Sequence, residues 1–230
     1  MMTLCPLCLN RSSFTEIKGP DKRTYLCCDK CKLVFTSTSF KPSRKEKEKR
    51  DKMQNDGVEN QEYVNILNQL IEPILPFLSP EMNGLDYGCS SEPALSILLK
   101  KRGLKCQDYN PGNSTLIENE TFDYIFVNNC LSEFFLPAKE LQKINNLLKP
   151  DGYLIIANEK WTTPEAFTRL SHAKDNTHVT FYHTNTFRYI AEKYKLSIIE
   201  SNNPRIVLMK KGKSDIELKD VKPKSELELV

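Results

Sequence analysis

The sequence lacks the long apolar run that a membrane-spanning helix requires. Charged residues interrupt its apolar stretches within about ten residues, whereas a spanning helix needs about 20. Residues 1–10 hold two cysteines but no apolar segment, so they do not predict a secretory leader. Neither sign of charge dominates, because 33 basic and 30 acidic residues leave a net charge of +3, too little to indicate a nucleic-acid or membrane surface. We therefore expect a soluble, cytoplasmic protein.

Cysteine is the residue whose distribution is most uneven. Five of the eight cysteines lie within the first 31 residues, and four of them form two pairs 19 residues apart, Cys5-x-x-Cys8 and Cys28-x-x-Cys31. Two such turns present four thiolates to a tetrahedral ion, which predicts a zinc ribbon over residues 1–40 with a structural metal. Cys27 is an alternative to Cys28, although only Cys28 keeps the two-residue spacing to Cys31. Redox-active pairs or free thiols are the other interpretation.

Two segments carry no apolar periodicity. Residues 41–60 begin with KPSRKEKEKRDKMQND, whose mixed charges favour a solvated linker or exposed helix over a nucleic-acid patch. Residues 211–230 are charged and aperiodic, and we expect a disordered tail there. The remaining residues, 61–210, are long enough for one α/β domain.

Residues 61–210 alternate between helical and extended apolar patterns. The expected helices are 61–78, broken near its end by Pro73 and Pro76; 92–102, closed by Gly103; 136–148; and 184–194, capped by a threonine or asparagine. The expected strands are 83–87, 104–109, 122–128 and 153–158, with a turn at 149–152 and a closing hairpin of 198–200 and 205–209. This alternation predicts an α/β fold whose mostly parallel sheet is covered by helices on both faces.

Five segments carry a resemblance to a known family. They are LDYGC at 85–89, YNP at 109–111, FDYIFVN at 122–128, LLKPDGYLII at 147–156 and DNTHVTFY at 175–182. In doubly wound folds a strand followed by a glycine turn lets a nucleotide-like cofactor approach the backbone. With these segments the chain resembles class I S-adenosylmethionine-dependent methyltransferases, specifically small ones with an N-terminal zinc ribbon. The resemblance implies a Rossmann-like sheet preceded by the ribbon.

The resemblance implies S-adenosylmethionine as cofactor and assigns the first turn of the fold to it. Asp86 and Gly88 would border the amino-acid end of the cofactor. The backbone of Cys89 and Ser90 would line the turn beneath it. A purely local interpretation remains for two of these residues, since Asp86 could cap the next helix and Gly88 could serve backbone conformation alone.

The resemblance also implies roles for three residues farther along the chain. Asn110 stands where the family usually has an acid that binds the ribose, and an Asx turn before Pro111 is the alternative. Asn128, at the end of the strand 122–128, would face the site. His178 is the candidate proton acceptor or substrate-side polar group, and a hydrogen-bonded packing residue is the alternative. Trp161 lines a substrate cavity or packs at its rim.

The chain also departs from the family pattern. The turn usually reads Asp-x-Gly-x-Gly-x-Gly, and here Ser90 and Glu92 replace the second and third glycines. Asn110 is neutral where an acid is usual, which removes charge assistance from its hydrogen bond. We expect methyl transfer to an unidentified acceptor, small molecule or macromolecule. The alternative is a catalytically degenerate methyltransferase fold that serves as a binding or scaffold protein. Nucleic acid is not indicated, because no basic and aromatic stripe is present.

Overall fold

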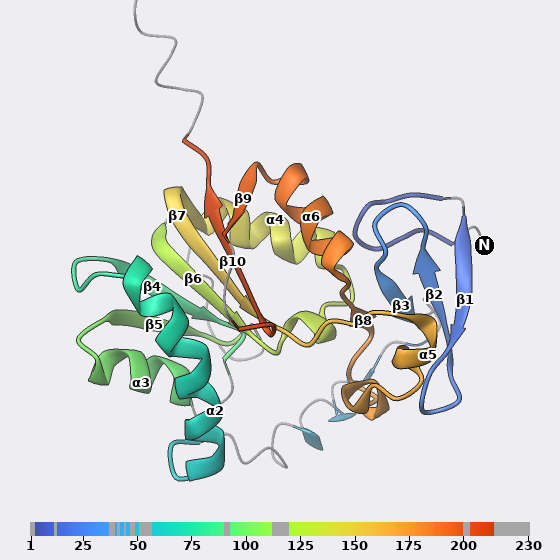
Figure 1. Cartoon of the computed structure of the whole chain (residues 1–230), viewed down its shortest axis with the longest axis horizontal. Coiled ribbons are helices and arrows are strands. Elements are labelled where there is room, and N and C mark those ends of the chain that lie inside the picture. Colours follow the sequence, from blue (N-terminus) through green and yellow to red (C-terminus); the bar gives the residue numbers. More distant parts are fainter. Residues whose placement is uncertain are drawn as a thin grey trace, which may run out of the picture.

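The chain folds into two sheets that lie side by side (Figure 1). The computed structural model describes residues 3–11, 13–36, 40, 42–43, 45–46, 49–50, 57–89, 93–111, 120–199 and 203–213. Within these ranges no helix has the length and apolarity needed to cross a membrane.

The larger sheet has six strands in the order β5-β4-β6-β7-β10-β9. They are β4 (Asn83–Tyr87), β5 (Lys105–Tyr109), β6 (Phe122–Asn128), β7 (Leu148–Ala157), β9 (Leu196–Ile199) and β10 (Ile206–Lys211). β4 pairs in parallel with β5 and β6, and β6 with β7, whereas β10 runs antiparallel between β7 and β9. The carboxyl ends of β5, β4 and β6 therefore meet at one edge.

Helices cover both faces of this sheet, as the sequence predicts (Figure 1). One face carries α2 (Gln61–Ile71), the 3-10 helix η1 (Glu72–Phe77) and α3 (Ala94–Lys101); the other carries α4 (Pro137–Leu147) and α6 (Thr184–Lys193). On the first face Leu67 and Leu99 share a core with Phe126. On the second, Ile144 and Ile190 pack with Val127. Burial on both sides explains why β6 and residues 153–157 of β7 are almost continuously apolar.

The backbone is irregular at two places that the sequence marks. The break expected near the end of the helix over 61–78 comes after Ile71, where α2 tightens into η1 because Pro73 has no N–H to donate. The turn expected at 149–152 is a bulge inside β7. Phe122 pairs with Leu148 and Tyr124 with Tyr153, so four residues of β7 face the single residue Asp123.

Two expectations are wrong at the ends of elements. The cap of α6 is neither threonine nor asparagine but His183, whose Nδ1 accepts the N–H of Asn185 at 3.1 Å while its own N–H donates to the Thr186 hydroxyl. The predicted tail begins one residue too early, since β10 continues through Lys211, which pairs with Leu196. Residues 214–230 lie outside the described part of the chain.

The smaller sheet has the strand order β1-β2-β3-β8. Its first three strands, β1 (Phe14–Lys18), β2 (Thr24–Cys28) and β3 (Val34–Thr36), come from the expected ribbon, and its fourth, β8 (Thr180–Phe181), comes from the α/β chain. Val34 pairs with Phe181, and the Thr36 N–H donates to the Val179 carbonyl at 2.9 Å. The ribbon therefore shares a sheet with the chain that follows β7.

The segment between β7 and β8 packs beneath the ribbon. It contains α5 (Pro164–Phe167) and the 3-10 helix η3 (Ser171–Lys174). The Tyr25 ring of β2 stacks edge-on against Phe167 at 5.1 Å and against Phe181 at 5.5 Å between ring centroids. The Tyr25 hydroxyl donates to the Ala173 carbonyl. This small aromatic core, separate from the two cores of the larger sheet, joins the ribbon to the α/β chain.

Candidate active site and metal centre

Asp86 lies near the carboxyl end of β4 with only 3% of its surface exposed. Burial, with a smaller contribution from Asp108, raises the pKa of Asp86 to about 8. Asp108 is its partner on β5 and forms an ion pair with Lys100 of α3 at 3.3 Å. A buried carboxyl that titrates near neutrality responds strongly to any charge or donor brought beside it.

The turn that leaves β4 is tied to the end of β5. Gly88 has φ +84°, and a Cβ there would lie 2.5 Å from the Cys130 sulfur, so no larger residue fits without a shift. The N–H groups of Gly88 and Cys89 both point to the Tyr109 carbonyl, at 2.7 and 3.3 Å. Ser90 and Glu92 lie outside the described residues.

Asn128 ends β6 on the same face of the sheet as Asp86. Its side-chain amide donates to the Tyr63 hydroxyl of α2 at 3.2 Å. Its other side-chain atom, Oδ1, is buried and has no hydrogen-bond partner within the described residues. Asn110 follows β5 at the same edge and is half-buried. The structure thus gathers Asp86, Gly88, Cys89, Asn110 and Asn128 around the ends of three adjacent strands.

His178 lies beside the loop that follows β6, since the N–H of the next residue, Val179, donates to the Ser132 carbonyl at 2.7 Å. The imidazole is buried, with 7% of the residue exposed. Its Nδ1 is 2.7 Å from the His172 carbonyl, and its Nε2 is 3.1 Å from the Arg50 guanidinium. Burial and the positive charge of Arg50 lower the pKa of His178 to about 4. The ring is therefore neutral, donates from Nδ1, and accepts at Nε2.

Arg50 is a functional candidate that sequence reasoning missed. It belongs to the stretch 41–60, expected to be solvated, yet its side chain is only 17% exposed. Its guanidinium pairs with Asp175 at 2.8 Å and with Glu133, in addition to His178. A run of mixed charges gives no signal for such a contact, because the partners lie far away in the sequence.

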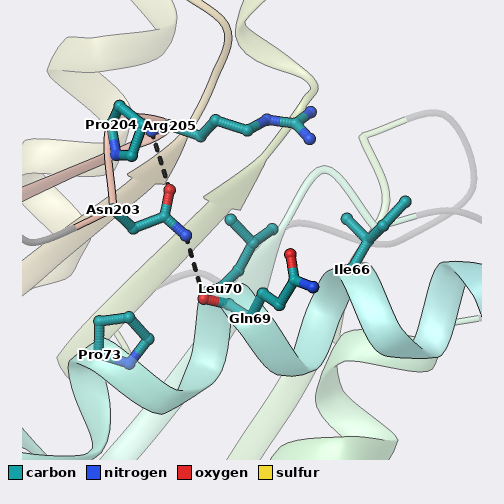
Figure 2. A pocket seen from close by; sticks show the side chains of 7 residues that line it. All are labelled: Ile66, Gln69, Leu70, Pro73, Asn203, Pro204 and Arg205. Atoms are coloured by element: carbon teal, nitrogen blue, oxygen red, sulfur yellow. Dashed lines mark hydrogen bonds between the residues drawn. The ribbon is translucent and has the colours of Figure 1, made fainter.

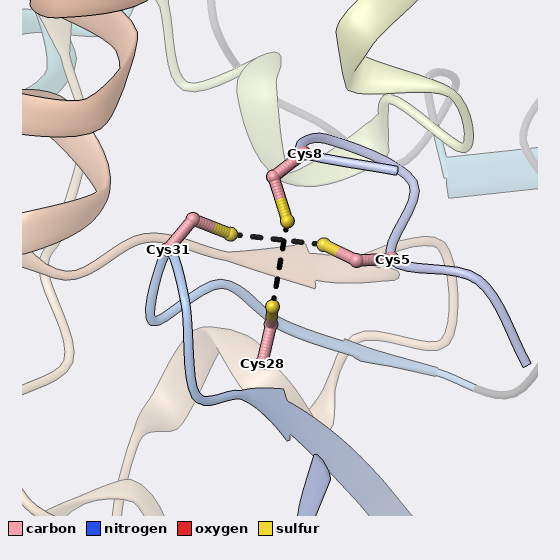
Figure 3. A group of neighbouring side chains, drawn as sticks. All are labelled: Cys5, Cys8, Cys28 and Cys31. Carbon is pink, nitrogen blue, oxygen red and sulfur yellow. Dashed lines mark hydrogen bonds between the residues drawn. The ribbon is translucent and has the colours of Figure 1, made fainter. Parts of the chain in front are cut away.

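Four cysteines converge on one point at the end of the ribbon (Figure 3). The sulfurs of Cys5, Cys8, Cys28 and Cys31 all lie within 4.8 Å of one another. Cys5 and Cys31 are 3.6 Å apart, and Cys8 and Cys28 are 3.5 Å apart. A tetrahedral zinc ion with Zn–S bonds of about 2.3 Å separates its sulfurs by about 3.8 Å. The four thiols fit such an ion.

The two cysteine turns have the same backbone form. The Leu9 N–H donates to the Cys5 carbonyl at 3.0 Å, and the Lys32 N–H donates to the Cys28 carbonyl at 2.8 Å. Leu9 and Lys32 both adopt positive φ, at 59° and 57°. Equivalent turns aim both pairs of sulfurs at a common centre, which is what the repeated spacing in the sequence requires.

Cys27 does not belong to this cluster. It packs from the other side of β2 with Val34 and Trp161, and burial raises the pKa of its thiol to about 11. The structure thus assembles the set that contains Cys28. Trp161 is buried as well, and its indole N–H donates to the Lys32 carbonyl at 3.2 Å. Its place in the fold is packing between the ribbon and the α/β chain.

A surface hollow of about 480 Å³ lies elsewhere (Figure 2). It is lined by Ile66, Gln69, Leu70, Pro73, Asn203, Pro204 and Arg205. Asn203 donates to the Gln69 carbonyl at 3.0 Å across it. The hollow sits between the α2–η1 segment and the residues that lead into β10. None of the expected cofactor residues lines it, and we assign it no role.

Comparison with solved structures finds similar methyltransferases. A Thermotoga maritima S-adenosylmethionine-dependent methyltransferase, described as a possible histamine N-methyltransferase, has 15% identity and a TM-score of 0.43 over 64% of this chain and 89% of its own. An O-methyltransferase family protein from Burkholderia thailandensis has 14% identity and a TM-score of 0.48 over 77% of this chain and 64% of its own. The 1,6-didemethyltoxoflavin-N1-methyltransferase of the same organism, with S-adenosylhomocysteine bound, has 16% identity and a TM-score of 0.44, covering 73% of this chain and 84% of its own.

A search of curated proteins finds no match. The family model of a methyltransferase domain matches residues 58–201, which is more than half of the chain. The match begins after the first three strands of the ribbon and runs from α2 to β9, leaving out only β10 of the larger sheet. The chain therefore belongs to the methyltransferase domain family, and the predicted class I S-adenosylmethionine-dependent methyltransferase is confirmed at the level of the family.

Proposed function

We propose that this protein transfers a methyl group from S-adenosylmethionine, bound at the carboxyl edge of β4, β5 and β6, to an acceptor that enters beside the loop after β6. The observation that carries the proposal is the gathering of Asp86, the Gly88 turn and the unsatisfied Asn128 oxygen on adjacent strand ends. Ligands of open α/β sheets bind at this edge.

The residues at this edge fit the proposed cofactor. A buried oxygen without a donor costs free energy, and an amino or hydroxyl group of the cofactor would satisfy Oδ1 of Asn128. Asp86 is held protonated by burial, so a cationic ammonium group or hydroxyl donors beside it would favour its ionised form. The backbone of Gly88 and Cys89 would then lie under the cofactor, with Asn110 toward its ribose.

In this proposal the chain's own residues mainly position the reactants and take little part in the chemistry itself. Bound S-adenosylmethionine would supply a methyl group that the acceptor attacks in line with its bond to the sulfonium sulfur, with S-adenosylhomocysteine as the leaving group, so that positioning matters above all. His178 is neutral at physiological pH, as a proton acceptor must be, but its Nε2 already accepts from Arg50. It can take a proton from an acceptor only after that contact opens.

The cysteine cluster supports a second part of the proposal, a structural zinc ion held by Cys5, Cys8, Cys28 and Cys31. Four thiolates leave no open position on the ion, so its role is to hold the ribbon together. None of the eight cysteines forms a disulfide bond, which fits a reducing compartment such as the cytoplasm.

Isothermal titration with S-adenosylhomocysteine tests the cofactor site. We expect the zinc-loaded protein to bind in the micromolar range and the Asp86→Asn variant to bind about ten- to a hundredfold more weakly, the loss expected for a hydrogen bond to a charged group. Asp123→Asn is the matched control, because Asp123 lies near the amino end of β6, at the end away from the proposed site, where it pairs with Lys149. No binding to folded protein at millimolar ligand would refute the enzyme and favour the scaffold alternative.

A further inference from the structure

The Arg50 cluster is the most completely built polar site that the proposed cofactor binding leaves unused. We define it as Arg50, Glu133, Asp175 and His178. Three different nitrogens of the guanidinium are engaged: Nε with Asp175 at 2.8 Å, one terminal nitrogen with Glu133, and the other with His178 Nε2 at 3.1 Å. The partners come from η2 (Leu131–Glu133) and from the loop between η3 and β8, so the fold around the larger sheet builds this guanidinium site.

The electrostatics of the cluster favour a cation in that position. Two carboxylates face one guanidinium, and the imidazole beside them is neutral, so the group as a whole carries a net negative charge. Burial by itself would lower the pKa of Arg50, but Glu133 and Asp175 outweigh burial and raise it. Without a cation there, two half-buried carboxylates would face each other and His178 Nε2 would lose its donor. The site requires an occupant of positive charge.

The occupant and its partners differ in how they are anchored. Asp175 is fixed locally, because its carboxylate accepts from both the N–H and the hydroxyl of Thr177. His178 is fixed through Nδ1 to the His172 carbonyl. Arg50 reaches them from outside the α/β body, since ten residues separate it from the start of α2. A partner that enters from the edge of a prebuilt site can be exchanged without dismantling that site.

The cluster adjoins the proposed cofactor edge. Glu133 follows Cys130 by one short turn, and Cys130 fills the space above Gly88 and donates its thiol to the Tyr87 carbonyl at 3.3 Å. The Thr180 hydroxyl donates to the Leu131 carbonyl at 3.0 Å and holds the same turn from the other side. A group bound by Glu133 and His178 would therefore lie on the acceptor side of the cofactor turn.

We propose that the Arg50 cluster is a cation subsite for the methyl acceptor, which Arg50 occupies from within the chain until an acceptor bearing a guanidinium or ammonium group replaces it. The exchange frees His178 Nε2 toward the newcomer and keeps the charge of the site unchanged. The subsite is defined by its own contacts, whereas its use for methyl transfer rests on the proposed function.

Rescue of an Arg50→Ala variant by a small cation tests the subsite. The probe is methylguanidinium, with neutral methylurea as its isostere, and the readout is the imidazole NMR signal of His178. We expect methylguanidinium to bind the variant about tenfold or more tightly than methylurea, because charge-assisted hydrogen bonds are about twice as strong as neutral ones. Its binding should return the His178 signal to its position in the parent protein and should weaken when Glu133→Gln is added.

Arg102→Ala is the matched control, because Arg102 is another partly buried arginine, and its guanidinium contacts Asn68 and Glu72, neither of which belongs to the cluster. Methylguanidinium should leave the His178 signal of that variant unchanged. Equal binding of methylurea and methylguanidinium, or no effect of either on His178 in Arg50→Ala, would overturn the subsite.

If Arg50→Ala does not fold, Arg50→Lys serves instead, because it keeps the charge and loses the fork of the guanidinium. Methylguanidinium should then displace the lysine and move the His178 signal, and failure to do so at saturating probe counts against the proposal. Titration of the same samples with S-adenosylhomocysteine tests the subsite and the proposed function separately. Loss of rescue with intact cofactor binding refutes the subsite alone, and rescue without cofactor binding refutes the proposed function.

Discussion

The two sheets of this protein are stabilised in different ways. The six-stranded sheet is covered on both faces, and β6 and the second half of β7 bury most of their side chains. The four-stranded sheet has short strands, and one side of it forms only a small aromatic core. The residues around its four cysteines share the core that lies under α4 and α6 of the larger sheet. The larger sheet can therefore rely on apolar burial, whereas the smaller one would draw part of its folding free energy from the proposed zinc ion.

The comparison also indicates how the proposed metal centre could be coupled to the loop that follows β6 in the larger sheet. β3 follows the second cysteine turn and pairs with β8. The hydroxyls of Thr180 in β8 and of Tyr182 just after it both donate to the Leu131 carbonyl and so hold the loop after β6. These hydrogen bonds connect the ribbon to the end of the larger sheet where we propose that the acceptor enters. The predictions below test whether the two sheets depend on each other as these bonds imply.

The largest effect is expected from Cys28→Ser. Structural zinc contributes about 10–16 kcal/mol of apparent binding free energy in zinc-finger peptides, which is comparable to the whole stability of a domain. We expect loss of bound zinc and fast hydrogen exchange at Thr36 and β8, while β6 and β7 stay protected. Cys27→Ser is the control, because Cys27 lies outside the cluster and should leave the zinc content intact. Unchanged protection of β8 in Cys28→Ser would show that β8 does not depend on the metal.

A cavity in the core of the larger sheet should lower the unfolding free energy and leave the zinc content unchanged. Ile156 is fully buried in the central strand β7, and its replacement by alanine should cost about 2–5 kcal/mol of unfolding free energy. Denaturant titration measures the loss, and atomic absorption should find the zinc content of the folded variant unchanged. A variant that loses zinc while folded would mean that the ribbon draws its stability from the larger sheet.

A smaller effect is expected at the cofactor turn. Gly88→Ala should destabilise the protein by about 1–3 kcal/mol through the left-handed backbone and should also lose S-adenosylhomocysteine affinity, because the new Cβ meets Cys130. Gly103→Ala separates the two causes. Gly103 has nearly the same φ, +81°, but nothing lies within 4 Å of its added Cβ. It should lose stability alone, and equal ligand affinity in both variants would contradict the role of the Gly88 turn.

The last prediction concerns how the unfolding free energy changes with pH. Asp86 has a pKa of about 8 in the folded protein and an ordinary, lower value when unfolded, so between about pH 4 and 8 the native state binds the extra proton. Unfolding free energy should therefore fall as pH rises through this window in the parent protein and fall less in Asp86→Asn. Thermal denaturation across the window measures it. Parallel pH profiles for the two proteins would show that Asp86 is not held protonated.

The sequence was sufficient to predict most strands of the larger sheet and the convergence of the two cysteine pairs. Strands such as 122–128 are long, apolar and bounded by turns, and the paired spacing of the cysteines requires two equivalent turns. β8 escaped prediction because two residues are too few to show a period, and its partner β3 lies far away in the sequence. The His183 cap escaped because a histidine seldom caps a helix, and Arg50 because its contacts depend entirely on tertiary structure.

The origin of β8 has a consequence for biosynthesis. The four parallel strands of the larger sheet lie between β3 and β8 in the sequence, so the ribosome delivers the first three strands of the ribbon long before the fourth. Until residues 180–181 emerge, β3 is an open edge whose N–H and C=O groups are free to pair with a neighbouring chain. A nascent chain stalled before β8 should be the species most prone to aggregate, and completion of the α/β body is what closes that edge.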